Sequence, residues 1–66
     1  MKNYEHKVIF LNGNEECFYC GGFVEAIVLG MAYAQQKGWD MRIKYVTDEK
    51  GTTIKDVEYP SYKFAK

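Results

Sequence analysis

The stretch between Gly22 and Gly38 constrains the fold most, because its apolar residues recur at helical spacing. At roughly 100° per residue, most apolar side chains gather on one side of a helix. That side holds Phe23, Val24, Ala26, Ile27, Gly30, Met31, Tyr33 and Ala34. Lys37 followed by Gly38 is a typical stop signal. The pattern therefore predicts one amphipathic helix between the two glycines.

Small residues form a line along this predicted helix. Ala26, Gly30 and Ala34 recur at every fourth position, so they lie one above another on one side. Without bulky side chains, that line lets the helix approach a neighbouring element closely. We expect the neighbour to be the chain's own β-sheet.

The polar side of the helix is narrow. Glu25 and Gln36 lie near its centre, and Val28 and Leu29 lie at its two margins. A sheet covers only one side of a helix, so these two apolar side chains are expected near solvent in a monomer. A second protein chain that covered them would gain apolar contact area.

Length and composition indicate one small folded domain, residues 1–66. The chain is 47% hydrophobic and 17% aromatic, which compensates for the limited surface that so short a chain can bury. Nine basic residues balance nine acidic ones, which disfavours electrostatic binding to nucleic acid or to an anionic membrane. There is no apolar leader or membrane-spanning run, and two cysteines are too few for a disulfide scaffold, so we expect a cytoplasmic protein.

The N-terminal part predicts a β-hairpin. Two β-prone runs, 4–11 and 14–20, flank Asn12-Gly13, the strongest short signal for a type I′ turn. A two-residue loop pairs Val8 with Cys17, and a three-residue loop through residue 14 moves each pair by one position. The sequence pattern leaves both registers open.

The C-terminal part predicts a second hairpin, with strands 41–47 and 52–59. We expect a three-residue loop that ends with Gly51 in the left-handed conformation. The resulting pairs are Thr47/Thr53, Val46/Ile54, Tyr45/Lys55, Lys44/Asp56, Ile43/Val57, Arg42/Glu58 and Met41/Tyr59. This register opposes unlike charges, whereas a four-residue loop would set Lys44 against Lys55. It also places Ile43 and Val46 on opposite faces.

These elements predict a small α+β domain of ββαββ order. Antiparallel hairpins form a sheet, and the helix packs on one face of it. Pro60 cannot donate to a strand ladder, so residues 60–66 are expected to be a short C-terminal tail. The alternative order, βαββ, leaves residues 15–20 as a loop.

Cys17-Phe-Tyr-Cys20 stands between a predicted strand and the helix. It resembles the Cys-Pro-Tyr-Cys motif of glutaredoxins, with Phe18 in place of proline. The resemblance implies thiol-disulfide activity, with Cys17 as a nucleophile of lowered pKa and Cys20 as the resolving thiol. On a β-strand, however, the two cysteines would lie on opposite faces, about 10 Å apart along the strand, too far to bridge.

Other chemistry has little support in the sequence. His6 is the only histidine and is expected to be an ordinary strand residue, so no metal site is predicted. Glu25 lacks a second carboxylate for acid-base catalysis. No cofactor or small-molecule substrate is indicated. Aromatic residues on the sheet, Phe18, Tyr19 and Tyr45, leave single-stranded nucleic-acid binding as an alternative.

The function that the sequence favours is a non-enzymatic binding or assembly module that acts through protein-protein contacts, including self-association as a homodimer. Its composition is typical of a bacterial or phage accessory protein. The residues expected at a partner are Val28, Leu29, Tyr33, Trp39 and Tyr62. In the competing interpretation, Tyr62 and Phe64 fold back over Leu29 and complete a monomeric core.

Overall fold

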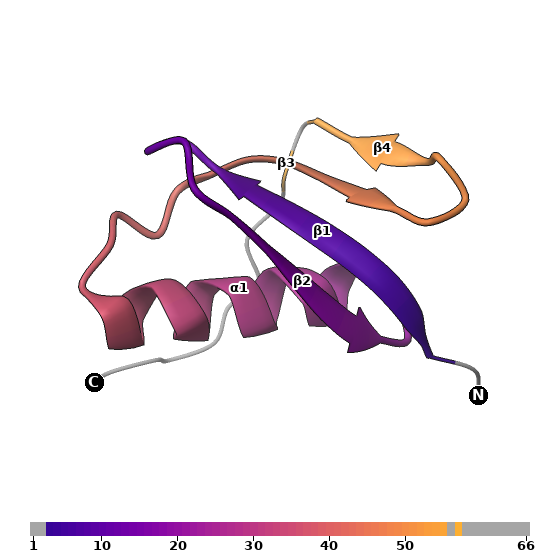
Figure 1. The fold of residues 1–66 in the computed structure, drawn as a ribbon, viewed down its shortest axis with the longest axis horizontal. Coiled ribbons are helices and arrows are strands. Elements are labelled where there is room, and N and C mark those ends of the chain that lie inside the picture. Colours follow the sequence, from indigo (N-terminus) through magenta and orange to yellow (C-terminus); the bar gives the residue numbers. More distant parts are fainter. Residues whose placement is uncertain (1–2, 56, 58–66) are drawn as a thin grey trace.

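The computed structural model describes residues 3–55 and 57, which form an antiparallel sheet with one helix across one face (Figure 1). The elements of this part of the chain are β1 (Tyr4–Phe10), β2 (Glu15–Cys20), α1 (Phe23–Lys37), β3 (Ile43–Asp48) and β4 (Thr53–Ile54). The strand order in the sheet is β2-β1-β3-β4. The predicted ββαββ order is therefore confirmed. The βαββ alternative is wrong, because residues 15–20 pair with β1 as a strand.

β1 is a central strand, and its side chains alternate between the two faces of the sheet. His6, Val8 and Phe10 point to the helix side and are fully buried. Their intervening neighbours face the other side of the sheet. The core consists of Val8, Phe10, Cys20, Ala26, Ile27, Met31, Ala34, Ile43 and Val46.

The helix packs closely on β1, as the line of small residues predicts. Ala26, Gly30 and Ala34 are all buried against the sheet. A Cβ atom at Gly30 would lie only 3.1 Å from Cγ1 of Val8, closer than packed carbon atoms normally approach. Glycine at position 30 therefore sets how near α1 comes to β1.

Gly38 ends the helix as predicted. It has a left-handed backbone, with φ 78°, and its N–H donates to the carbonyl of Gln35 at 3.2 Å. The N–H of Trp39 donates to the carbonyl of Ala34 at 2.8 Å. This pair of bonds is a Schellman motif, and it turns the chain so that Trp39 packs against the core.

The loop of the first hairpin differs from both predicted registers. The N–H of Phe10 donates to the Asn14 carbonyl at 2.8 Å, so the loop consists of residues 11–13. Gly13 alone takes positive φ there, and the Asn12 side chain accepts the N–H of Asn14 at 2.9 Å. A type I turn followed by a left-handed glycine replaces the predicted type I′ turn. Consequently Val8 pairs with Glu16.

The second hairpin uses the same kind of loop, as predicted. Gly51 has φ 90°, and the N–H of Asp48 donates to the Thr52 carbonyl at 3.0 Å. The predicted pairs Val46/Ile54 and Thr47/Thr53 are confirmed. The described strands are shorter than predicted, since β3 begins at Ile43 and β4 ends at Ile54. The pairs Lys44/Asp56, Arg42/Glu58 and Met41/Tyr59 and the tail 60–66 involve positions outside the described residues.

A β-bulge in β3 changes which face of the sheet Ile43 lies on. Ile9 pairs with Tyr45, but Phe10 pairs with Ile43, so Lys44 is an extra residue on β3. The bulge turns Ile43 to the same side as Val46, and both are buried in the core. The prediction that these two residues lie on opposite faces is therefore wrong.

We predict that serine destabilises the protein at Gly13 and at Gly51 but not at Gly22. A Cβ would meet no atom within 4 Å at any of the three positions, so only the backbone differs. The left-handed conformation should cost about 1–2 kcal/mol at each of the first two. Gly22 is extended and lies at the N-cap of α1, where serine is favoured.

The free energy of unfolding in urea measures these effects. Equal losses of stability in all three variants would contradict the assignment of Gly13 and Gly51 as conformationally required glycines.

Candidate functional site

β2 is an edge strand, and the hydrogen bonds of β1 show which of its backbone groups point outward. The carbonyl of Glu5 accepts the N–H of Glu49 at 3.2 Å, and the N–H of Leu11 donates to the Arg42 carbonyl at 3.1 Å. Odd-numbered residues of β1 therefore turn their backbone groups toward β3, and even-numbered ones face β2. By the alternation of antiparallel pairing, the outward backbone groups of β2 belong to residues 15, 17 and 19.

This outer side of β2, here called the open edge, has the features of a strand that can accept another. Within the described part of the chain, the outward groups of Glu15, Cys17 and Tyr19 have no backbone partner. β2 contains no proline, lysine or arginine and shows no bulge in its pairing with β1. Natural edge strands commonly carry such features to block pairing with other chains. The opposite edge, β4, is only two residues long.

Aromatic side chains connect the inner side of β2 to the helix. Tyr33 of α1 contacts Phe18 at a ring-centroid distance of 5.9 Å and Trp39 at 5.5 Å, and Trp39 contacts Phe10 at 5.5 Å. The Tyr33 hydroxyl donates to the carboxylate of Glu16 at 3.1 Å. Two residues predicted to contact a partner, Tyr33 and Trp39, thus take part in packing between α1 and the sheet.

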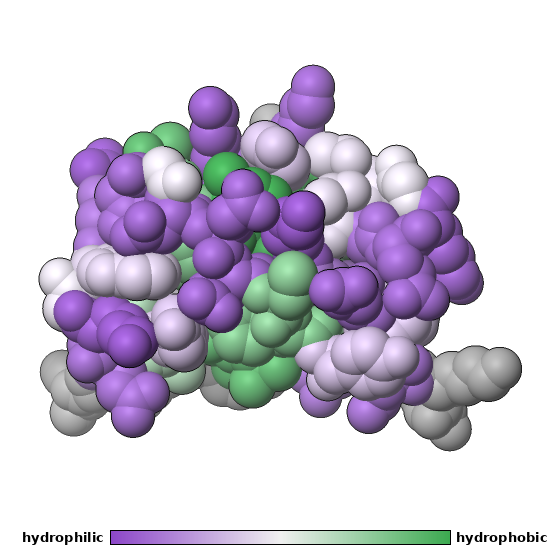
Figure 2. Space-filling model, viewed as in Figure 1, coloured by the Kyte–Doolittle hydropathy of each residue, from purple (hydrophilic) through white to green (hydrophobic). Residues whose placement is uncertain are grey.

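Leu29 lies on the β2 side of the helix. It precedes Tyr33 by one helical turn, so both side chains project toward the same flank of α1. Leu29 is 37% exposed, and Tyr19 at the open edge is 71% exposed. Figure 2 shows apolar side chains gathered over the middle of α1, with hydrophilic residues on both sides. The open edge is therefore bordered by apolar and aromatic surface.

The four predicted partner residues that the structure describes, Val28, Leu29, Tyr33 and Trp39, do not form one continuous surface. Val28 is half-buried and, with Val24, lines a hollow on the other side of the helix from Leu29. Val24 was expected on the apolar side of the helix but is 63% exposed. Tyr62, and with it the predicted folding of the tail over Leu29, lies outside the described residues.

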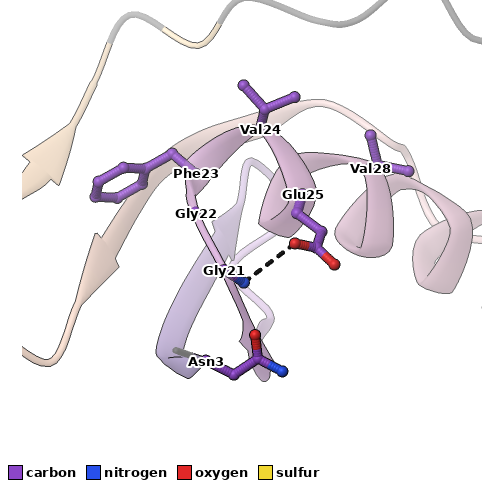
Figure 3. A pocket seen from close by; sticks show the side chains of 7 residues that line it. All are labelled: Asn3, Gly21, Gly22, Phe23, Val24, Glu25 and Val28. Atoms are coloured by element: carbon purple, nitrogen blue, oxygen red, sulfur yellow. Dashed lines mark hydrogen bonds between the residues drawn. The ribbon is translucent and has the colours of Figure 1, made fainter. Parts of the chain in front are cut away.

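A hollow of about 560 Å³ lies at the start of α1 (Figure 3). Gly22 provides no side chain to cap the helix, and the carboxylate of Glu25 instead accepts the N–H of Gly21 at 3.1 Å. A negative charge thus already occupies the position where a helix N-terminus would attract an anion. Asn3, Phe23, Val24 and Val28 complete the lining.

The two cysteines lie on opposite faces of β2, as the alternation predicts. Both are free thiols; Cys17 is exposed and Cys20 is buried. Desolvation is the main cause that raises the pKa of each thiol, and for Cys17 a hydrogen bond with Glu5 raises the pKa further. The glutaredoxin resemblance implied a lowered pKa for Cys17. The structure gives the opposite direction.

His6 lies in β1 as predicted, but its complete burial was not anticipated from the sequence. Its Nδ1–H donates to the Tyr4 carbonyl at 2.9 Å, and its ring contacts Tyr4 and Phe23. Nε2 has no hydrogen-bond partner. Among residues 3–55 and 57, no three His, Cys, Asp or Glu side chains are grouped as a metal site.

The uncovered face of the sheet has a hollow whose lining carries an acidic excess. Its hollow beside Cys17 is lined by Glu5, Lys7, Thr47, Asp48 and Glu49. Lys7, the one basic residue among those that line this hollow, forms an ion pair with Glu15 at 3.5 Å. Tyr19 and Tyr45 lie on this face, but Phe18 packs toward the helix on the other. Acidic neighbours repel the phosphate groups that nucleic-acid binding requires.

Comparison of this chain with protein-family models, with curated proteins and with solved structures gives no match. Within the described part of the chain, no helix has the length and apolar character needed to cross a membrane.

We predict that iodoacetamide labels Cys17 but not Cys20 in the native protein. Because desolvation raises the pKa of Cys17 above its ordinary value, its thiolate fraction at neutral pH is smaller than that of an ordinary cysteine. Labelling at pH 7 should be slower than in an unstructured peptide and should accelerate with rising pH. Mass spectrometry measures both.

Cys17→Ser should abolish native labelling, and urea should then expose Cys20 as the only reactive thiol. Labelling at pH 7 faster than in the peptide, or a disulfide between the two cysteines in air, would instead favour the glutaredoxin-like alternative.

Proposed function

We propose that this protein is a non-enzymatic binding and assembly module that adds a strand of another protein chain to the open edge of β2. The observation that carries the proposal is the edge itself. β2 is a regular strand of six residues, and the outward backbone groups of three of them, Glu15, Cys17 and Tyr19, lack partners in the described part of the chain. Strand addition satisfies such groups with main-chain hydrogen bonds.

Side chains beside the edge would give the bound strand specificity. Tyr19 on the uncovered face and Leu29 on the helix flank are large, exposed and apolar or aromatic. Tyrosine is one of the usual anchors of protein interfaces, and covering either side chain removes apolar surface from water. Phe18 of β2 and Tyr33 of α1 pack against each other beside Leu29, so the helix side of the edge is held by an aromatic contact.

The positions of the two cysteines and of the charged side chains favour this proposal over thiol-disulfide activity and over single-stranded nucleic-acid binding. The mechanism implied by the glutaredoxin resemblance needs a nucleophilic and a resolving thiol that can meet, but Cys17 is exposed and Cys20 is buried. Nucleic-acid binding needs a positive field, and the hollow beside Cys17, on the face that carries Tyr19, is lined by three carboxylates, Glu5, Asp48 and Glu49. Two free thiols in so small a chain suit the reducing cytoplasm, which is where we place the protein.

Site-specific photo-crosslinking in the cells that make the protein tests the proposal. Benzoylphenylalanine replaces Tyr19 at the open edge or, as a matched control, Val24 on the other side of the helix. Both positions are exposed, at 71% and 63%, so labelled chains should fold equally well. We expect a protein adduct of defined mass from position 19 and none from position 24.

A second change makes the experiment sharper. Leu29→Lys, introduced together with the crosslinker at position 19, should reduce the adduct strongly because the charge disturbs the apolar flank of the edge. The proposal fails if the folded protein gives no adduct from position 19, or gives equal adducts from positions 19 and 24.

A further inference from the structure

We infer that the strand that β2 accepts is β2 of a second copy of this chain, paired antiparallel. This inference rests on the proposed function, because it names the partner at the same edge. The result would be a symmetric dimer with a continuous sheet of both copies and with both helices on one face of it. A strand edge of this kind is self-complementary when like charges are kept apart.

The direction of the outward groups restricts the register. Residues 15, 17 and 19 turn their backbone groups outward. In an antiparallel dimer, each of them can therefore form a hydrogen-bonded pair only with an odd-numbered residue of the second copy. A register centred on Phe18 places Cys17 opposite Tyr19 of the second copy. Glu16 then lies opposite Cys20 of the second copy, and five positions of each strand overlap.

Charge placement favours this antiparallel arrangement. Both acidic residues of β2, Glu15 and Glu16, stand at its beginning. Antiparallel pairing about Phe18 sets them against the uncharged end of the other strand, with the Glu16 residues of the two copies four strand positions apart, about 13 Å. A parallel arrangement would instead align like charges side by side.

The same acidic residues give little reason to expect a basic partner. Glu15 already forms an ion pair with Lys7, at 3.5 Å. Glu16 accepts the hydroxyl hydrogen bond of Tyr33, at 3.1 Å. Both carboxylates therefore have partners within the chain, and the rest of β2 is uncharged. Within residues 3–55 and 57, the groups that lack partners at the edge are backbone groups, and the edge of a second β2 can pair with them.

The helix side of the edge also fits a second copy. Phe18 would face Phe18 of the second copy in a pair that is not hydrogen-bonded, where side chains are closest. The aromatic contacts from Trp39 through Tyr33 to Phe18 would then continue across the dimer axis. Leu29, on the same flank as Tyr33, would be covered by the helix side of the second copy.

Molar mass by light scattering on the purified full chain tests the inference. We expect the mass to rise with concentration toward twice the 7.7 kDa of one chain. Cys17→Pro removes an outward N–H from each edge strand, which an edge tolerates, and should weaken the dimer by at least about tenfold. Cys17→Ala keeps the N–H and should leave the dimer unchanged.

Amide hydrogen exchange gives a test that needs no variant. The amides of Cys17 and Tyr19 should exchange rapidly in dilute solution and become protected as the dimer forms. The amide of Phe18, which faces β1, should be protected throughout. A chain that stays monomeric, or a dimer that leaves the amides of Cys17 and Tyr19 unprotected, overturns the inference.

These outcomes are separate from those of the crosslinking experiment. A monomeric purified chain whose position 19 crosslinks in cells to a protein of another mass would refute self-pairing while supporting the open edge as a binding site. A chain with neither dimer nor adduct would refute both.

Discussion

The close approach of α1 to β1 at Gly30 is the contact on which the rest of the structure depends. Val8 lies directly beneath this glycine and is fully buried, and Phe10 lies within 3.6 Å of the position that a Cβ would take. A short chain buries little surface, so it depends on dense packing at such a contact. The helix packs over β1 and β2. β2 is the outer strand of the sheet, and its open edge lies beside Leu29 and Tyr33 of the helix.

Local sequence patterns predicted most of the fold. The helix follows from apolar spacing and from Gly38, and the second hairpin follows from Gly51 and its charge pattern. The first hairpin was predicted, but its register was wrong because Asn12-Gly13 suits two turn types, and in the structure only the glycine takes positive φ. The bulge at Lys44 arises where β3 pairs with β1, far away in sequence, and no local pattern of β3 reveals it.

The candidate site was harder to predict because it depends on strand order. The sequence indicated Leu29 as an exposed apolar residue, but it grouped Tyr33 and Trp39 with it, whereas those rings pack between helix and sheet. The open edge exists because β3 pairs with β1 on the side away from β2. Because this pairing joins strands that are far apart in sequence, the residues of β2 do not indicate that β2 is an edge strand. The absence of proline and lysine in β2 could have hinted at an unprotected edge.

The effect of Gly30→Ala on stability, in the wild type and in a Val8→Ala background, tests the central contact most directly. Alanine is the better helix former by about 1 kcal/mol, and a surface position would show that gain. At Gly30 the added methyl group would lie 3.1 Å from Cγ1 of Val8, so we predict that the free energy of unfolding falls by about 1–2 kcal/mol. In the Val8→Ala background the loss should disappear or become a gain. A stabilised Gly30→Ala variant in the wild-type background would contradict this account of the fold.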